Sequence, residues 1–116
     1  MKSLVIKNKE WEIAKNAVLA DTFLSRARGL MFRKDMNDFD GMIIKPCNSI
    51  HTFGMRFSID VVFMNNKYEV VKVFENLKPY RMTRPYFSAT QVLELKAGTL
   101  NGRLTKGDLL EVSCIN

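Results

Sequence analysis

The sequence of 116 residues contains only one histidine and two cysteines. Cys47 and Cys114 lie far apart and no C-x-x-C pair is present, so we expect no zinc site. No apolar run approaches the roughly 20 residues that a membrane helix needs. The first residues, MKSLVIKNKEWEI, also lack the apolar core of a signal peptide. We therefore expect a cytoplasmic protein with reduced thiols, without a metal or other cofactor, and without membrane contact.

Length and composition favour one ordinary globular domain. A chain of 116 residues is close to the commonest domain size, so residues 1–116 are predicted to form a single domain. Apolar residues make up 47% and charged residues 26%, values that are typical of soluble globular proteins. Internal repeats, low-complexity tracts and Gly/Ser/Pro-rich linkers are all missing from the sequence. No oligomeric state follows from these features.

The net charge of +6 is spread unevenly along the chain. Between Asn76 and Lys106 the only acidic residue is Glu94, and the basic residues are Lys78, Arg81, Arg84, Lys96, Arg103 and Lys106. This pattern predicts a basic surface patch. Basic and aromatic side chains also alternate in residues 78–87, as they do where proteins stack nucleic-acid bases. No RNA-binding motif or glycine-rich phosphate loop accompanies them, so we favour a solvated face and do not expect nucleic acid.

Short strand-forming segments separated by turn residues dominate the chain. The clearest are Ile59–Met64 and Tyr68–Phe74, which Asn65-Asn66-Lys67 should join into a hairpin. Further strands are predicted at Ser3–Asn8, Trp11–Lys15, Ala17–Ala20, Gly41–Lys45, Gln91–Leu95 and Leu109–Ile115. One short helix is predicted at 23–28, after the N-cap residue Thr22. The fold class is therefore mainly β, as an antiparallel sandwich or a partly closed barrel with one short N-terminal helix.

Three sequence elements in a fixed order cover most of the chain. They are RARGLMFR at residues 26–33, HTFGMRFSIDVVF at residues 51–63, and VLELKAG at residues 92–98 followed by KGD at residues 106–108. This set resembles the small prokaryotic family called DUF192, also labelled UPF0127, and the chain is identified as a member on that basis. The resemblance implies a compact, mainly β domain. It implies no reaction, because the family label records an unknown function.

His51 is the first candidate for a functional side chain. If residues 51–55 form a strand, His51, Phe53 and Met55 share one face. The ring can then transfer protons near neutral pH, or it can be a buried neutral group bonded to a backbone carbonyl. Cys47, His51 and Met55 also suit a soft metal, but on a strand Cys47 and Met55 lie too far apart for one ion. Nucleophilic catalysis by Cys47 or Ser49 with His51 as base is a further alternative.

Two carboxylates, Asp60 and Glu94, each stand between apolar residues of a predicted strand. A buried charge without a partner is costly, so each must face water or meet a cation. The candidate partners are Arg28, Arg33 and Arg56. We expect Glu94 to be buried on the same side of the sheet as Val92, bonded to an arginine or to backbone N–H groups. Either an internal clamp or a small polar pocket would bring Asp60 and Glu94 together.

These residues lead to a prediction about function. We predict a non-catalytic binding module for a small polar ligand or for a protein or peptide segment. The predicted ligand-binding residues are Arg28, His51, Thr52, Asp60 and Glu94. One alternative is a hydrolase- or isomerase-type enzyme in which His51 works with Asp60 or Glu94 as acid and base. A basic surface for nucleic acid is the third alternative.

Overall fold

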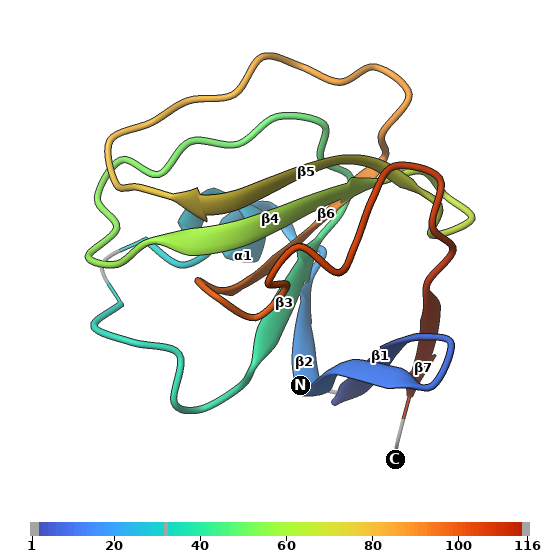
Figure 1. The fold of residues 1–116 in the computed structure, drawn as a ribbon. Coiled ribbons are helices and arrows are strands. Elements are labelled where there is room, and N and C mark those ends of the chain that lie inside the picture. Colours follow the sequence, from blue (N-terminus) through green and yellow to red (C-terminus); the bar gives the residue numbers. More distant parts are fainter. Residues whose placement is uncertain (1–2, 32, 115–116) are drawn as a thin grey trace.

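One seven-stranded sheet and one short helix make up the computed structural model, which describes residues 3–31 and 33–114 (Figure 1). The strand order is β5-β4-β6-β3-β2-β1-β7. The elements are β1 (Leu4–Asn8), β2 (Trp11–Ala20), α1 (Phe23–Arg28), β3 (Gly41–Ile44), β4 (Ile59–Met64), β5 (Val70–Leu77), β6 (Gln91–Lys96) and β7 (Glu111–Cys114). The predicted mainly β class with one short helix is confirmed. Phe32 of the first motif and Ile115 of the last predicted strand lie outside the described residues.

The sheet is mixed, because β2 and β3 run parallel while the other neighbouring strands pair antiparallel. A parallel pair needs a crossover connection, and α1 lies within that connection. In Figure 1 the sheet curls, with β4 and β5 across the top and β1 and β7 below. A bridge between Glu69 and Leu109 links the segments that precede β5 and β7. The sheet therefore approaches a partly closed barrel without closing.

The sheet contains two hairpins, and the one formed by β4 and β5 is the hairpin predicted from the sequence. Strand β4 pairs with β5 from Ile59 opposite Leu77 to Met64 opposite Val70. Asn65 shapes the turn, because its Oδ1 accepts the N–H of Lys67 at 2.9 Å and that of Glu69 at 3.0 Å. Strands β1 and β2 form the N-terminal hairpin, and β2 continues without interruption to its end at residue 20.

Helix α1 begins and ends where the sequence predicts. The Thr22 hydroxyl accepts the Ser25 N–H at 3.1 Å, and the Ser25 hydroxyl accepts the Thr22 N–H at 3.0 Å, which together form a capping box. Gly29 ends the helix with φ +48° and donates its N–H to the Ser25 carbonyl. Within residues 3–31 and 33–114, no helix is long and apolar enough to cross a membrane.

The two faces of the sheet carry separate core clusters. Alternate residues of the buried central strands point to opposite faces, since strand side chains have a period of two. Val62, Leu93 and Leu95 belong to the first core cluster. Val61 and Val92 belong to the second core cluster, together with Leu30, Ile44, Ile50, Met55 and others. The residues that follow α1 and the loop after β3 therefore pack on the second face.

Residues 45–58 form a loop between β3 and β4, so the strand considered above for residues 51–55 is not formed. The loop runs beside residues 78–83, where His51 makes a single bridge to Met82. Gly54 has φ +79°, and the chain turns there with Met55 N–H donating to the Thr52 carbonyl. Because of this turn, His51 is exposed while Met55 is buried. The two side chains therefore do not share a strand face.

Candidate functional site

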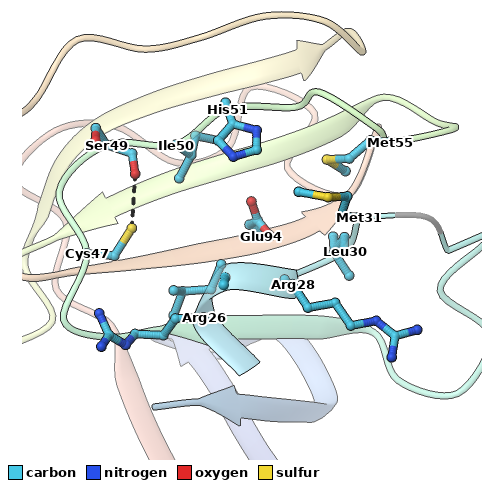
Figure 2. Close-up of a pocket in the computed structure, with 13 residues that line it drawn as sticks. Arg26, Arg28, Leu30, Met31, Cys47, Ser49, Ile50, His51, Met55 and Glu94 are labelled. Carbon is cyan, nitrogen blue, oxygen red and sulfur yellow. Dashed lines mark hydrogen bonds between the residues drawn. The ribbon is translucent and has the colours of Figure 1, made fainter. Parts of the chain in front are cut away.

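A cavity of about 90 Å³ lies between the end of α1, the 45–58 loop and β6 (Figure 2). Five larger apolar side chains line it: Leu30, Met31, Ile44, Ile50 and Met55. Polar or titratable side chains also line it: Arg26, Arg28, Cys47, Ser49, His51 and Glu94. Figure 2 shows Glu94 in the middle, with Cys47 on one side and Met55 on the other. Three distant parts of the sequence therefore build one site.

Glu94 is the central polar group of this cavity. Its side chain lies on the second face of the sheet, because β6 places it opposite Val61 of β4. The residue is only 3% exposed, and its buried Oε1 has no hydrogen-bond partner. Burial without such compensation disfavours the charged form and raises the pKa of Glu94 from 4.5 to about 7. The carboxyl group therefore changes its charge near neutral pH and can accept a hydrogen bond from a bound group.

The predicted arginine partner of Glu94 is not in place. Arg26 and Arg28 line the cavity, but Figure 2 shows both guanidinium groups directed away from Glu94. Arg26 Nη1 donates instead to the Pro46 carbonyl at 3.4 Å, and Arg28 is exposed. Long cationic side chains at a surface helix keep their charged ends in water. The predicted burial of Glu94 is confirmed, whereas the predicted bond to an arginine or to backbone N–H groups is wrong.

Arg26 contributes a second buried polar atom without a partner, its Nε. Arg26, Cys47 and Glu94 line the same cavity. Burial, the largest effect, raises the pKa of Cys47, and the Sγ donates to the Ser49 carbonyl at 3.1 Å. A thiol held in its protonated form is a poor nucleophile at neutral pH. Burial of the thiol therefore disfavours the alternative of catalysis by Cys47.

Asp60 lies on the opposite face of the sheet, so the prediction that it meets Glu94 is wrong. Asp60 precedes Val61 on β4, and the period of two directs it toward the first core cluster. The side chain is fully buried. Its Oδ1 accepts the Asn76 N–H at 2.9 Å and its Oδ2 accepts the Leu100 N–H at 3.0 Å. Asp60 therefore acts as a clamp between the end of β5 and the chain after β6.

Thr52 is also a structural residue, and it does not line the cavity. It is fully buried, and its hydroxyl donates to the Lys78 carbonyl at 2.7 Å and accepts the Arg81 N–H at 2.8 Å. Its backbone N–H donates to the Arg81 carbonyl, and its carbonyl accepts the Tyr80 N–H. These four bonds fasten residues 78–83 beside the loop that carries His51.

His51 lies at the border between the cavity and an exposed surface that we call the aromatic ledge. The ledge consists of His51, Phe53, Tyr80 and Met82, and the last three are 41%, 69% and 70% exposed. The ring of His51 stacks on Phe53 at 5.4 Å, and Phe53 lies 6.5 Å from Tyr80. Residues 41–59 and 76–93, which carry the ledge, contain no acidic residue and five basic ones. His51 therefore lies beside both the cavity and an exposed, mostly apolar surface.

Two of the basic residues predicted to form one patch are held in different places. The Arg84 guanidinium stacks over Tyr86 at 4.4 Å, and that of Arg103 stacks over Trp11 at 3.9 Å. Tyr86 packs against the second core cluster and Trp11 against the first. The two cations are therefore anchored on different faces of the sheet.

The described part of the chain contains no cluster of side chains suited to bind a metal ion. No three His, Cys, Asp or Glu side chains gather there closely enough to hold an ion. Cys47, His51 and Met55, considered above as a soft-metal set, all line the cavity, but Figure 2 shows Cys47 and Met55 on opposite sides of Glu94.

Sequence reasoning missed Arg26 and the role of Gly29. A Cβ atom at Gly29 would lie 3.9 Å from both the Arg26 carbonyl oxygen and Glu94 Oε1, so the glycine leaves room at this wall of the cavity. Both residues belong to the RARGLMFR element. In the sequence this element indicated only the family. Its closeness to Glu94 depends on how α1 packs against β6, which the sequence does not show.

Comparisons with known proteins agree on the family and the fold. The family model DUF192, described as "Uncharacterized ACR", matches residues 5–112. The UPF0127 protein of Pyrococcus horikoshii is 39% identical over 93 residues, which is 76% of this chain and 76% of that protein. The UPF0127 protein of Pyrococcus furiosus is 35% identical over 113 residues, which is 92% of this chain and 93% of that protein.

Two solved structures are similar along nearly the whole chain. A Novosphingobium aromaticivorans protein of unknown function has a TM-score of 0.78 and 25% identity, covering 94% of this chain and 83% of its own. A Sinorhizobium meliloti protein, named as a candidate transcription regulator, has a TM-score of 0.76 and 22% identity, covering 96% and 92%. The second likeness concerns the fold alone.

Proposed function

Because this chain belongs to the DUF192 (UPF0127) family, which is described only as uncharacterized, we propose a function from the geometry of the cavity. The protein is a non-catalytic binding module that takes a small polar ligand, or one polar group of a larger ligand, next to Glu94. The observation that carries this proposal is the buried carboxyl group of Glu94, which lines the cavity and whose Oε1 has no hydrogen-bond partner.

The energetics of the carboxyl group support this role. A buried polar atom without a hydrogen bond costs about 1–3 kcal/mol, so it is retained only where something other than stability requires it. Asp60 shows that the same fold can satisfy a buried carboxylate fully with backbone N–H groups. Glu94 differs in that its side chain borders a cavity instead of a closed core. A bound donor would remove the penalty and make binding favourable.

The surroundings of the cavity suit a ligand that has one polar group and an apolar or planar part. The apolar wall can exclude water from a bound group and strengthen its hydrogen bond to Glu94. The aromatic ledge begins at His51 on the rim of the cavity, and it can carry an apolar or planar part of the same ligand.

A screen of small polar compounds against the ¹⁵N-labelled protein, followed by NMR, tests the proposal. We expect compounds that bind to shift the amide signals of Gly29, His51 and Glu94. Replacing Glu94→Met should abolish these shifts, because it removes the polar group and keeps a side chain of similar length. Glu75→Gln, which removes an exposed carboxylate elsewhere, is the matched control and should retain them. Hits that survive Glu94→Met, or that map away from the cavity, would contradict the proposal.

Acid–base catalysis is the second candidate. The pKa of about 7 at Glu94 suits proton transfer at neutral pH, and His51 lines the same cavity. Asp60 is excluded from this role by its place on the other face of the sheet. If the protein is an enzyme, a compound that binds in the cavity should be converted slowly by the wild type, and neither His51→Asn nor Glu94→Gln should convert it. NMR of the compound over several hours would detect the product.

A further inference from the structure

The side chains of the aromatic ledge lie next to one another and form one exposed apolar surface. Of the side chains that the structure describes, six large apolar or aromatic ones are exposed, and three of them, Phe53, Tyr80 and Met82, belong to the ledge. The Phe53 ring lies between those of His51 and Tyr80, and a backbone bridge places Met82 opposite His51. Single exposed apolar side chains are common, whereas a contiguous group is typical of interaction sites.

Tyr80 has a backbone conformation that bulky residues rarely adopt. Its φ is +62°, in the left-handed region, and its N–H donates to the Thr52 carbonyl at 3.2 Å. Tyr68 has a φ of +64°, but it packs against the first core cluster. Core packing does not explain Tyr80, whose side chain is 69% exposed. Such conformations are concentrated at binding sites and switches. A backbone that is already fixed also loses little entropy when a partner binds.

The exposed charges around the ledge are positive. The two segments that carry the ledge contain no acidic residue, and neither does helix α1 across the cavity. The basic residues of the second segment are all exposed: Lys78, Arg81 and Arg84. Arg81 Nη1 donates to the Tyr80 carbonyl at 3.4 Å, which holds this cation next to the ledge. Glu75 precedes the segment, but its carboxylate accepts the Gly102 N–H instead. An acidic partner is therefore complementary to this surface.

The arrangement of the side chains favours a protein segment over a nucleic acid. Bases stack on free faces of aromatic rings. His51 and Phe53 stack on each other with 24° between their planes, so part of one face of each ring is covered. The Arg84 guanidinium already lies over the Tyr86 ring at 4.4 Å. Met82 offers no aromatic face, but its flexible thioether adapts well to the apolar side chains of a protein partner.

We propose that the aromatic ledge binds an acidic segment of a partner protein. An apolar side chain of the segment, such as phenylalanine, leucine or methionine, packs on Phe53, Tyr80 and Met82. Carboxylates on either side of it meet Lys78 and Arg81. This inference goes beyond the proposed function, because it concerns the ledge and requires no ligand next to Glu94.

A display library of random peptides tests the proposal on the immobilised wild-type protein. Peptides of about seven residues are suitable, because in extended form they span roughly 23 Å. We expect the selected peptides to carry aspartate or glutamate on either side of an apolar residue. A selected peptide, made synthetically, should shift the ¹⁵N amide signals of Phe53, Tyr80 and Arg81. Neutral or basic selected peptides, an empty selection, or shifts confined to other residues would overturn the proposal.

Matched variants identify the apolar contacts. Tyr80→Asn removes the ring and introduces a residue that tolerates the left-handed region, and Met82→Gln keeps the length of the side chain. Each should weaken the selected peptide at least about tenfold, as for a central side chain of an interface. Leu109→Gln is the control, because Leu109 is 61% exposed and lies outside the ledge. It should bind the peptide like the wild type. Equal affinity of all three variants would contradict the proposal.

A second pair of variants identifies the charged contacts. The double variant Lys78→Gln/Arg81→Gln removes two charges beside the ledge, and Lys67→Gln/Lys106→Gln removes two exposed charges elsewhere. The first should weaken the acidic peptide several-fold more than the second, and the difference should shrink at high salt. Equal weakening by both pairs would show that only the net charge matters, and it would overturn the acidic recognition.

Two further measurements separate the proposal from its rivals. Glu94→Met should lose any ligand of the cavity and still bind the selected peptide like the wild type, so the ledge and the proposed function fail in different experiments. Loss of the peptide in Glu94→Met would show that it binds in the cavity, and the ledge would be overturned. Single-stranded oligouridylate tests nucleic acid at the same salt concentration. It should bind more weakly than the peptide; tighter binding that displaces the peptide would replace the protein segment by a nucleic acid.

Discussion

Glu94→Gln should make the stability of the protein much less dependent on pH. The wild-type carboxyl group is buried, has an unpartnered Oε1, and has a pKa raised by burial from 4.5 to about 7. Because the folded state holds the proton more tightly than the unfolded state, this group's favourable contribution is complete below pH 4.5. It is lost as the pH rises to 7 and beyond. The difference between the two pKa values corresponds to roughly 3 kcal/mol.

The variant removes this loss because glutamine does not ionise. Its own unsatisfied amide group affects stability equally at every pH, so the informative quantity is the change with pH. We expect the stability of Glu94→Gln relative to the wild type to increase by roughly 3 kcal/mol between about pH 4.5 and about pH 8.5. Urea denaturation at several pH values, followed by circular dichroism, measures this difference directly.

Asp60→Asn is a control that should lower stability at neutral pH, where Glu94→Gln should raise it relative to its effect at low pH. Both oxygens of Asp60 accept backbone N–H groups, so an amide nitrogen in place of one oxygen would face another donor. We expect this variant to be less stable than the wild type at neutral pH by about 1.5–3 kcal/mol. A Glu94→Gln curve that stays parallel to the wild type across the pH range would refute the assignment of Glu94 as an unpaired, buried carboxyl group.

Two further predictions concern residues beside the cavity. Thr52→Val keeps the shape of the side chain but leaves the Lys78 carbonyl and the Arg81 N–H without their hydroxyl partner. It should lower the free energy of unfolding by about 1–3 kcal/mol and speed hydrogen exchange in residues 78–83; unchanged exchange there would contradict the role of Thr52. The raised pKa of Cys47 predicts slow reaction with a thiol reagent at neutral pH in the folded protein and fast reaction after unfolding. Equally fast reaction in both states, measured by mass spectrometry of the modified peptide, would show that the thiol is not protected.

The burial of Glu94 could be predicted from β6 alone, whereas its surroundings could not. Leu93 and Leu95 occupy one face of the strand, and the apolar Val92 indicated that the other face is also covered. The failed part of the prediction concerned Arg28. Whether a side chain on α1 turns toward or away from β6 depends on how the helix is placed on the sheet, and no local pattern encodes that placement.

The relation between Asp60 and Glu94 depends on the register between β4 and β6. Both residues interrupt apolar strands, and their sequence contexts are nearly the same. The register pairs Glu94 with Val61, so the preceding Asp60 points to the other face. A shift by one residue would have brought the two carboxylates to the same side. Register is a property of two strands together, and the separate sequences of β4 and β6 did not reveal it.

The loop at residues 45–58 shows where composition misleads. Its residues have strand-forming character, yet the segment forms only one isolated bridge with its neighbour, supplemented by scattered backbone and side-chain hydrogen bonds. Thr52 bonds to residues 78–81, and the Ile50 N–H donates to the Thr83 hydroxyl at 3.0 Å. Glycine at position 54 allows the turn between them. Tertiary contacts thus take the place of regular strand pairing. As a result His51 is exposed, although Met55 in the same loop is buried.

The pairing of β1 with β7 has a consequence for synthesis on the ribosome. β1 lies between β2 and β7, with Leu4 opposite Cys114 and Lys7 opposite Glu111. One edge of the first strand therefore stays open until the seventh strand has been translated. An open strand edge is a template for pairing with another chain, so the nascent protein is exposed to aggregation until β7 has been made. A chaperone that covers the N-terminal hairpin would be most useful during this interval.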